Sequence, residues 1–213
     1  ALAKQTVTFN VTKPENISSQ EAIQVKYKDS TVTAEADGTY KLPAGTYSYT
    51  VTCSGCETEN GTFEVASEDK KITVNLEKTL TFEDFFTELD GRATVKTGTG
   101  KAQFKPVKDG AEKYLQSTNA NSSVDGIVAL DFDRATKLTF SYMVSEEGNK
   151  ETGENYGLII QRNNTQVDGF KEISSDWKTY TISADKGDKI TLLYKYNEST
   201  DWNHEDEDWV RLK

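Results

Sequence analysis

Residues 37–53 read DGTYKLPAGTYSYTVTC, and this stretch indicates the fold of the chain. From Tyr47 to Cys53, aromatic and apolar residues alternate with Ser and Thr. The same period of two recurs in GTFEV at 61–65 and in KITVNL at 71–76. This alternation is typical of antiparallel strands with one buried and one solvated face. The Gly and Pro residues of the quoted stretch predict tight turns. Gly accepts a positive φ, and the ring of Pro fixes its own φ at a value that suits a turn.

The composition restricts the class of protein. A chain of 213 residues has room for one large domain or two ordinary ones. Only 35% of the residues are hydrophobic, yet ten Tyr and nine Phe are present. This combination favours a β protein with solvated outer faces over a disordered chain. The net charge is −10 and no cluster of Lys or Arg occurs, so we expect neither nucleic acid nor an anionic membrane as a partner.

The sequence contains no recognisable targeting segment. No apolar run approaches the roughly 20 residues of a membrane span, so membrane insertion is not expected. The first residues lack the basic and apolar pattern of a signal peptide, which is therefore either absent or already removed. We interpret the chain as an excised fragment of a larger protein.

The hydrophobic pattern predicts an all-β chain of two β-sandwich domains, at 1–77 and 79–213. About seven strands are expected in the first domain and about ten in the second, which predicts a jelly roll there. The three- and four-residue spacing of apolar residues from Phe82 to Leu89 indicates one or two helical turns, ended by Gly91. The predicted strands lie near 5–12, 22–28, 31–35, 39–42, 46–53, 61–66, 70–76, 92–97, 101–106, 112–117, 125–132, 136–144, 155–162, 166–170, 176–183, 188–196 and 207–212.

The first domain resembles a known family of small sandwiches. Its pattern is D-G-x-Y, then L-P-x-G-x-Y-x-Y-x-V, then G-x-F-x-V and V-x-L, all within about 1–77. These motifs resemble PEGA and carboxypeptidase-regulatory-like domains, which are related to the pilin CnaB fold. The resemblance implies an Ig- or transthyretin-like sandwich in a secreted bacterial surface protein. CnaB relatives often carry a Lys–Asn isopeptide bond, but no acidic residue lies between Tyr40 and Cys56 to catalyse it.

The second domain is similar to another family. Five runs carry this resemblance, and they span about 80–213. They resemble jelly-roll modules of surface proteins and glycan-degrading enzymes of Gram-positive, especially clostridial, bacteria, many of which are carbohydrate-binding modules. The family usually has an Asp near a structural calcium where this chain has Lys213, so calcium is possible here but not favoured. The five runs are KLTFSYMVSEE (137–147), NYGLII (155–160), DWKTYTI (176–182), GDKITLLYKY (187–196) and EDWVRL (207–212).

The two cysteines form the motif Cys53-Ser54-Gly55-Cys56. A redox C-x-x-C motif begins a helix in a βαβ unit, whereas this one ends a strand and enters a Gly turn. Two ligands are too few for a structural zinc site. Two alternatives remain, namely a pair of packed, reduced thiols or a local disulfide in the turn.

Catalysis is not expected. His204 is the only His, and no nucleophile motif accompanies it, so a Ser–His or Cys–His arrangement is disfavoured. A glycosidase needs only two carboxylates, and 35 acidic residues leave that alternative open by composition. However, no acidic residue lies in an obviously apolar strand context that would raise its pKa. We therefore predict that the protein is not an enzyme.

An acidic segment precedes the last strand. Asp201, Asn203 and Glu205 alternate like the first ligands of a calcium loop. The sixth position is Asp206 rather than Gly, and the twelfth is Leu212 rather than Glu, so the segment is not an EF-hand. We interpret it as a solvated acidic loop and predict no metal and no cofactor.

The tryptophans are the strongest candidates for a ligand surface. Val210 and Leu212 occupy one face of the last strand, so Trp209 and Arg211 should lie on the opposite, outward face. Trp177 is expected in the core instead, together with Tyr142, Tyr194 and Tyr196. Flat aromatic faces stack on sugar rings, and amide, carboxylate or hydroxyl groups bind the sugar hydroxyls. The predicted ligand-binding residues are Trp202, Trp209, Asp201, Asn203, His204 and Arg211.

We expect this chain to bind a polysaccharide or oligosaccharide without catalysis. The jelly roll would be the binding module, and the N-terminal sandwich would be a spacer. The protein would be secreted or attached to the bacterial cell surface, and other modules of the parent protein are possible partners. The alternative is a structural or adhesive stalk that binds a protein or nothing at all and has no sugar ligand. In that case the first domain, a neighbouring molecule or another module of the parent protein would cover the two tryptophans.

Overall fold

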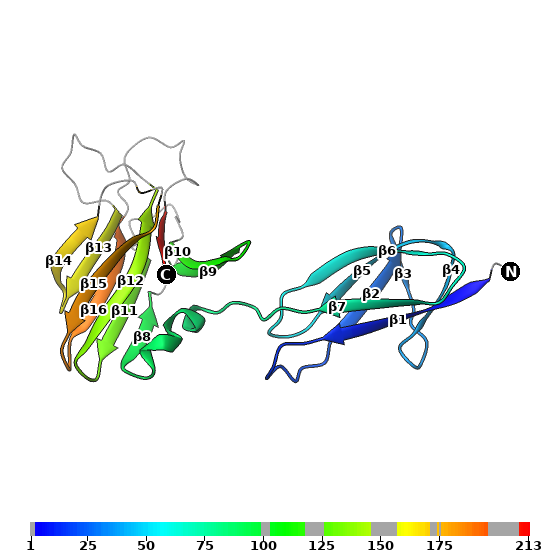
Figure 1. The fold of residues 1–213 in the computed structure, drawn as a ribbon, viewed down its shortest axis with the longest axis horizontal. Coiled ribbons are helices and arrows are strands. Elements are labelled where there is room, and N and C mark those ends of the chain that lie inside the picture. Colours follow the sequence, from blue (N-terminus) through cyan, green and yellow to red (C-terminus); the bar gives the residue numbers. More distant parts are fainter. Residues whose placement is uncertain are drawn as a thin grey trace. The chain divides into compact units, whose positions relative to one another are not determined.

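The computed structural model describes residues 3–98, 103–117, 126–145, 157–170, 174, 176–195 and 209–213. These residues form strands and a single 3₁₀ helix, so the prediction of an all-β chain with β-sandwich units is confirmed. The chain divides into two compact units, Ala1–Thr79 and Leu80–Lys213 (Figure 1).

The first unit is a sandwich of a three-stranded and a four-stranded sheet. The strand orders are β4-β1-β7 and β3-β2-β5-β6. Strand β1 pairs antiparallel with β4 and parallel with β7, whereas the pairs of the second sheet are all antiparallel. The strands are β1 (Lys4–Thr12), β2 (Ala22–Tyr27), β3 (Ser30–Val32), β4 (Tyr40–Pro43), β5 (Gly45–Thr52), β6 (Glu59–Val65) and β7 (Lys70–Asn75).

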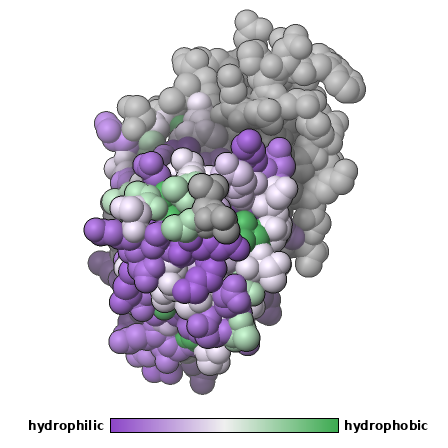
Figure 2. Space-filling view, turned by 90° about the vertical axis from the view of Figure 1, so that its right-hand side faces the viewer, coloured by the Kyte–Doolittle hydropathy of each residue, from purple (hydrophilic) through white to green (hydrophobic). Residues whose placement is uncertain are grey.

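The alternation that predicts β5 and β6 forms the core of this unit. Tyr47 and Val51 of β5 are buried, as are Phe63 and Val65 of β6. The rings of Tyr47 and Phe63 stack with centroids 5.6 Å apart and planes 18° apart. Each such buried side chain stabilises the fold by roughly 1.5–3 kcal/mol relative to an exposed one. In Figure 2, which views the first unit from its N-terminal side, hydrophilic residues dominate and hydrophobic areas are small and separate.

The second unit consists of two five-stranded antiparallel sheets. Their orders are β15-β12-β17-β10-β9 and β14-β13-β16-β11-β8. Between β10 and β17 the chain passes repeatedly from one sheet to the other, which is the winding of a jelly roll. The strands are β8 (Ala93–Thr97), β9 (Phe104–Asp109), β10 (Glu112–Ser117), β11 (Gly126–Phe132), β12 (Thr136–Val144), β13 (Gly157–Arg162), β14 (Thr165–Phe170), β15 (Lys178–Ala184), β16 (Lys189–Lys195) and β17 (Val210–Leu212).

The core of the second unit lies between these two sheets. Tyr142 and Tyr194 are buried in it, as predicted, and the ring of Tyr142 stacks on Phe170 at 4.3 Å. Tyr196 lies outside the described residues. The 3₁₀ helix η1 (Phe82–Leu89) packs its aromatic residues against this core, and it ends at Asp90, whose φ is 47°. The predicted helical turns are therefore present.

We expect Phe63→Ala to destabilise the first unit strongly. The Phe63 ring is buried against Phe9 and Tyr47, and such a truncation costs about 3–5 kcal/mol of the free energy of unfolding. Thr62 is exposed on the same strand, so Thr62→Ala is the matched control and should change this free energy by less than about 0.5 kcal/mol. Urea denaturation measures both, and equal midpoints for the two variants would contradict the assigned core.

Candidate functional site

Two of the predicted ligand-binding residues, Trp209 and Arg211, fall within the described residues. The other four lie outside them, so their role stays a prediction. The described part of the candidate site therefore centres on β17, and the four residues outside the described part are Asp201, Trp202, Asn203 and His204.

The alternation of side chains in β17 places Trp209 and Arg211 away from the core. Val210 and Leu212 are buried, at 0% and 4% exposure, whereas Trp209 and Arg211 are half-buried on the opposite face. The Trp209 amide donates to Ser145 Oγ at 2.6 Å, and the Val210 amide donates to a buried hydroxyl, Ser117 Oγ, at 2.8 Å. These bonds fix β17 between its two neighbours and thereby fix the direction of both outward side chains.

Arg211 lies between two aromatic rings on this outward face. Its guanidinium carbon is 3.9 Å from the ring centroid of Trp209 and 4.4 Å from that of Tyr114 on β10. Its Nε donates to Gln116 Oε1 at 2.9 Å. A cation over an aromatic face is attracted by the ring quadrupole, with about 0.5–1 kcal/mol at exposed sites and about 2 kcal/mol when desolvated. The strand partner and the two rings therefore hold Arg211 in one orientation.

Trp177 belongs to the same face, so the prediction that it lies in the core is wrong. Its ring centroid is 6.0 Å from that of Tyr114, and Lys213 Nζ lies 4.0 Å from the Trp177 centroid. Trp177 precedes β15 by one residue and shares its parity with the exposed Thr179, whereas the core side of β15 carries Ile182. The sequence alone shows that Trp177 and Ile182 fall on opposite faces of this strand. Applying this alternation would have predicted an outward Trp177.

A carboxylate connects Trp177 to β17. Glu112 Oε2 accepts a hydrogen bond from Trp177 Nε1 at 3.3 Å, and Glu112 Oε1 pairs with Lys213 Nζ at 2.9 Å. The hydrogen bond from Lys213, followed by that from Trp177, lowers the pKa of the Glu112 carboxyl below its ordinary value. Glu112 is therefore ionised at neutral pH and holds both partners in place.

We call this set of outward side chains the aromatic cluster. Tyr114 is 2% exposed and covered by its neighbours, whereas Trp177 and Trp209 are half-buried and keep part of their rings accessible. The cluster combines accessible apolar rings with charged and amide groups, which is the chemistry that binds sugar rings and their hydroxyls. Its members are Glu112, Tyr114, Gln116, Trp177, Trp209, Arg211 and Lys213.

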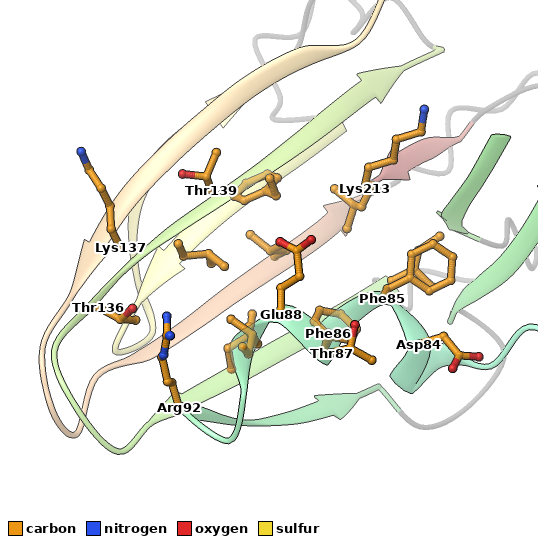
Figure 3. Close-up of a pocket in the computed structure, with 17 residues that line it drawn as sticks. Asp84, Phe85, Phe86, Thr87, Glu88, Arg92, Thr136, Lys137, Thr139 and Lys213 are labelled. Atoms are coloured by element: carbon orange, nitrogen blue, oxygen red, sulfur yellow. The ribbon is translucent and has the colours of Figure 1, made fainter. Parts of the chain in front are cut away.

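The second unit also contains a cavity of about 430 Å³. Figure 3 shows Thr136, Lys137 and Thr139 of β12 on one side of it, and η1 residues including Phe86 and Glu88 on the other. The floor is apolar and belongs to the core between the sheets, whereas the rim carries charged side chains.

Neither a metal site nor a reactive thiol is evident in the described part of the chain. No group of three or more His, Cys, Asp or Glu side chains lies close enough to hold a metal ion among these residues. Cys53 and Cys56 are free thiols, and Cys53 is buried, with its Sγ 3.4 Å from the Ser19 carbonyl oxygen. Burial raises the pKa of the Cys56 thiol, followed in importance by a hydrogen bond with Cys53. A raised pKa lowers the thiolate fraction, so Cys56 is a poor nucleophile.

Comparison with known proteins gives limited information. No family model matches the chain, and no curated protein matches it. Among solved structures, a secreted serine protease, VesC, from Vibrio cholerae is 10% identical with a TM-score of 0.45, covering 100% of this chain and 50% of that one. The isomalto-dextranase of Arthrobacter globiformis T6, complexed with panose, is 12% identical with a TM-score of 0.29, covering 100% of this chain and 32% of that one.

A third similar structure contains CBM51-2 in complex with GlcNAc and INT domains from Clostridium perfringens ZmpB. It is 9% identical with a TM-score of 0.27, covering 98% of this chain and 48% of that one. The chain thus spans half or less of the length of these three structures. Within the described residues, no helix has the length and apolar character needed to cross a bilayer.

We expect Trp177→Ala to cost only about 1–2 kcal/mol of the free energy of unfolding, because it removes one exposed cation–π contact and partial packing. A buried aromatic residue would cost about 3–5 kcal/mol. Ile182→Ala on the same strand is the control and should cost about 2–5 kcal/mol, because Ile182 is buried. Thermal and urea unfolding measure both variants. If Trp177→Ala lowered the free energy of unfolding more than Ile182→Ala does, Trp177 would have to lie in the core, which would contradict its outward position.

Proposed function

We propose that the chain is a non-catalytic glycan-binding segment of a secreted or surface-attached bacterial protein. Residues 79–213 would be the carbohydrate-binding jelly roll, and residues 1–77 the spacer that supports it. The observation that carries this proposal is the aromatic cluster, in which the half-buried rings of Trp177 and Trp209 lie on the outward face of one sheet.

The geometry of the cluster suits a sugar ligand. The Trp209 ring is held by Arg211, which also lies over Tyr114, and the Trp177 ring near Tyr114 is held by Lys213 and Glu112. Fixed rings lose little conformational entropy when a ligand binds, so more of the stacking energy remains as affinity. Ionised Glu112 accepts hydrogen bonds from sugar hydroxyls, and the guanidinium of Arg211 donates to sugar oxygens.

The cluster offers binding groups without an evident catalytic pair. Glu112 is the carboxylate of the cluster, and its lowered pKa suits a hydrogen-bond acceptor rather than a general acid. Glycoside hydrolysis commonly requires a second carboxylate across the scissile bond. We therefore expect binding without turnover, so that the chain releases no reducing sugar from the polysaccharides that it binds.

A structural or adhesive stalk is the second candidate. It is favoured by the cations of the cluster, because Arg211 lies over Trp209 and Lys213 lies over Trp177. Each cation covers part of a ring that a sugar would need. In this alternative, the cluster stabilises the sheet surface and has no ligand.

Affinity electrophoresis in gels containing starch, mannan or xylan tests the proposal. The unmodified chain should be retarded by at least one polysaccharide, and Trp209→Ala should weaken that binding by about 1–3 kcal/mol, the scale of an aromatic anchor. Trp177→Ala should weaken it by a similar amount. Tyr27→Ala, which removes an aromatic residue that is 44% exposed in the first unit, is the matched control and should leave retardation unchanged.

Trp202→Ala tests the predicted residue outside the described chain in the same gels. It should weaken binding while the melting temperature moves little, because a loop anchor contributes to the ligand and not to the core. If Trp202→Ala lowered the melting temperature and left glycan binding unchanged, Trp202 would not be a ligand-binding residue. Absence of retardation on every polysaccharide by a folded chain would favour the stalk, and release of reducing sugar would show that the protein is an enzyme.

A further inference from the structure

The two cysteines of the chain lie at the two ends of one tight turn, directly after β5. The Cys56 amide donates to the Cys53 carbonyl oxygen at 3.0 Å. Gly55, the third residue of the turn, has a φ of 84°, which is the left-handed conformation found at that position of a type II turn. The α-carbons at the ends of such a turn are less than about 7 Å apart. Disulfides join α-carbons that are about 4.4–6.8 Å apart, so the backbone spacing permits a bond between the two thiols.

Both sulfur atoms lie on the core side of this turn. Cys53 continues the inward alternation of β5, two residues after the buried Val51, and belongs to the core of the first unit. The Cys56 side chain packs against the same core and shares a hydrogen bond with the Cys53 thiol. Because the side chains already meet, the two sulfur atoms can be joined without a large movement of the backbone. The two thiols are therefore positioned as partners for each other.

The two thiols differ in their access to solvent. Cys53 is 8% exposed, and its Sγ lies 3.4 Å from both the hydroxyl and the carbonyl oxygen of Ser19. Cys56 is half-buried, so a reagent in solution reaches it first. The two residues between the cysteines are exposed and leave the turn open on its outer side. A reaction with a reagent from solution therefore begins at Cys56 and ends at Cys53.

The same turn holds the end of the first unit. The Thr79 amide donates to the Gly55 carbonyl oxygen at 2.9 Å, and Cys56 forms an isolated β-bridge with Lys78. Thr79 is the last residue of the first unit. The rigidity of the turn therefore affects how firmly this end of the unit is held.

We propose that Cys53 and Cys56 form a disulfide by exchange with an external disulfide, and that this cross-link stiffens the turn that holds the end of the first unit. The Cys56 thiolate attacks one sulfur of the incoming disulfide, which releases one thiol and leaves a mixed disulfide on Cys56. The Cys53 thiolate then attacks the Cys56 sulfur, which forms the bond between the two cysteines and releases the second thiol. The protein loses two electrons and two protons, and the incoming disulfide is reduced to two thiols.

The surroundings of Cys56 favour a structural cross-link over redox catalysis. Burial, followed by the hydrogen bond with Cys53, raises the pKa of the Cys56 thiol, and the charge of Lys13 opposes this shift without reversing it. Lys13 is itself paired with Glu21 at 2.9 Å. The thiolate fraction is therefore small at neutral pH, and the exchange should become faster as the pH rises. Disulfides persist outside the cytoplasm, so the cross-link agrees with a secreted or surface protein but does not depend on the proposed glycan site.

Incubation of the full chain with oxidised glutathione at mildly alkaline pH, followed by mass spectrometry, tests the cross-link. The chain should lose the mass of two hydrogen atoms, and peptide mapping should find residues 53 and 56 joined to each other. Cys53→Ser cannot complete the second step, so its Cys56 should retain bound glutathione. Cys56→Ser is the matched variant, and its buried Cys53 should stay unmodified in the folded chain. Two free thiols, bound glutathione or a disulfide between two molecules in the chain without substitutions would overturn the proposal.

Hydrogen exchange of single amides, followed by NMR, tests the effect on the turn. The Thr79 amide should exchange at least about threefold more slowly in the oxidised chain than in the reduced chain, because the cross-link restricts opening of the turn. The Thr6 amide, which donates to Asp69 Oδ1 at 2.6 Å near the start of β1, is the control and should exchange at an unchanged rate. Both forms have the same sequence, so a folding defect of a variant cannot imitate this result. Equal exchange rates of Thr79 in the two forms would overturn the proposed stiffening.

Discussion

Burial of Val210 and Leu212 between β10 and β12 is the interaction on which the second unit depends. The three residues of β17 complete one sheet in its middle, and their two apolar side chains enter the core from there. Because side chains alternate along a strand, this burial also decides that Trp209, Arg211 and Lys213 face outward. The aromatic cluster follows from where this short strand lies in the sheet.

The surface interactions of the cluster are weaker than the burial that positions them. The pair Glu112–Lys213 is partly exposed, so water screens the attraction and the pair contributes little to stability. The cation–π contacts of Arg211 add about 0.5–2 kcal/mol each. Full burial of Leu212 and Val210 contributes roughly 1.5–3 kcal/mol for each side chain. The cluster therefore depends on the core for its position, and its own contacts mainly fix the orientation of the rings.

The strand pattern of this chain could be predicted closely, because a period of two is a local property of the sequence. Strand β12, for example, has the predicted bounds 136–144, and β9 begins three residues later than predicted. Trp177 was predicted in the core because its position in the resembled family is structural, whereas its parity with the exposed Thr179 places it outward. The contact of Arg211 with Tyr114, almost 100 residues apart in the sequence, depends on sheet order, which alternation along one strand does not specify.

The central claim is that the outward rings of the second sandwich form a glycan surface. Titration of the ¹⁵N-labelled chain with oligosaccharides of starch, mannan and xylan, observed through the three Trp indole N–H signals, tests this claim directly. With at least one of these sugars, the signals of Trp177 and Trp209 should shift in a saturable way while the amides of core strand β16 do not. Indole signals that stay unchanged with all three sugars, in a folded chain, would contradict the claim.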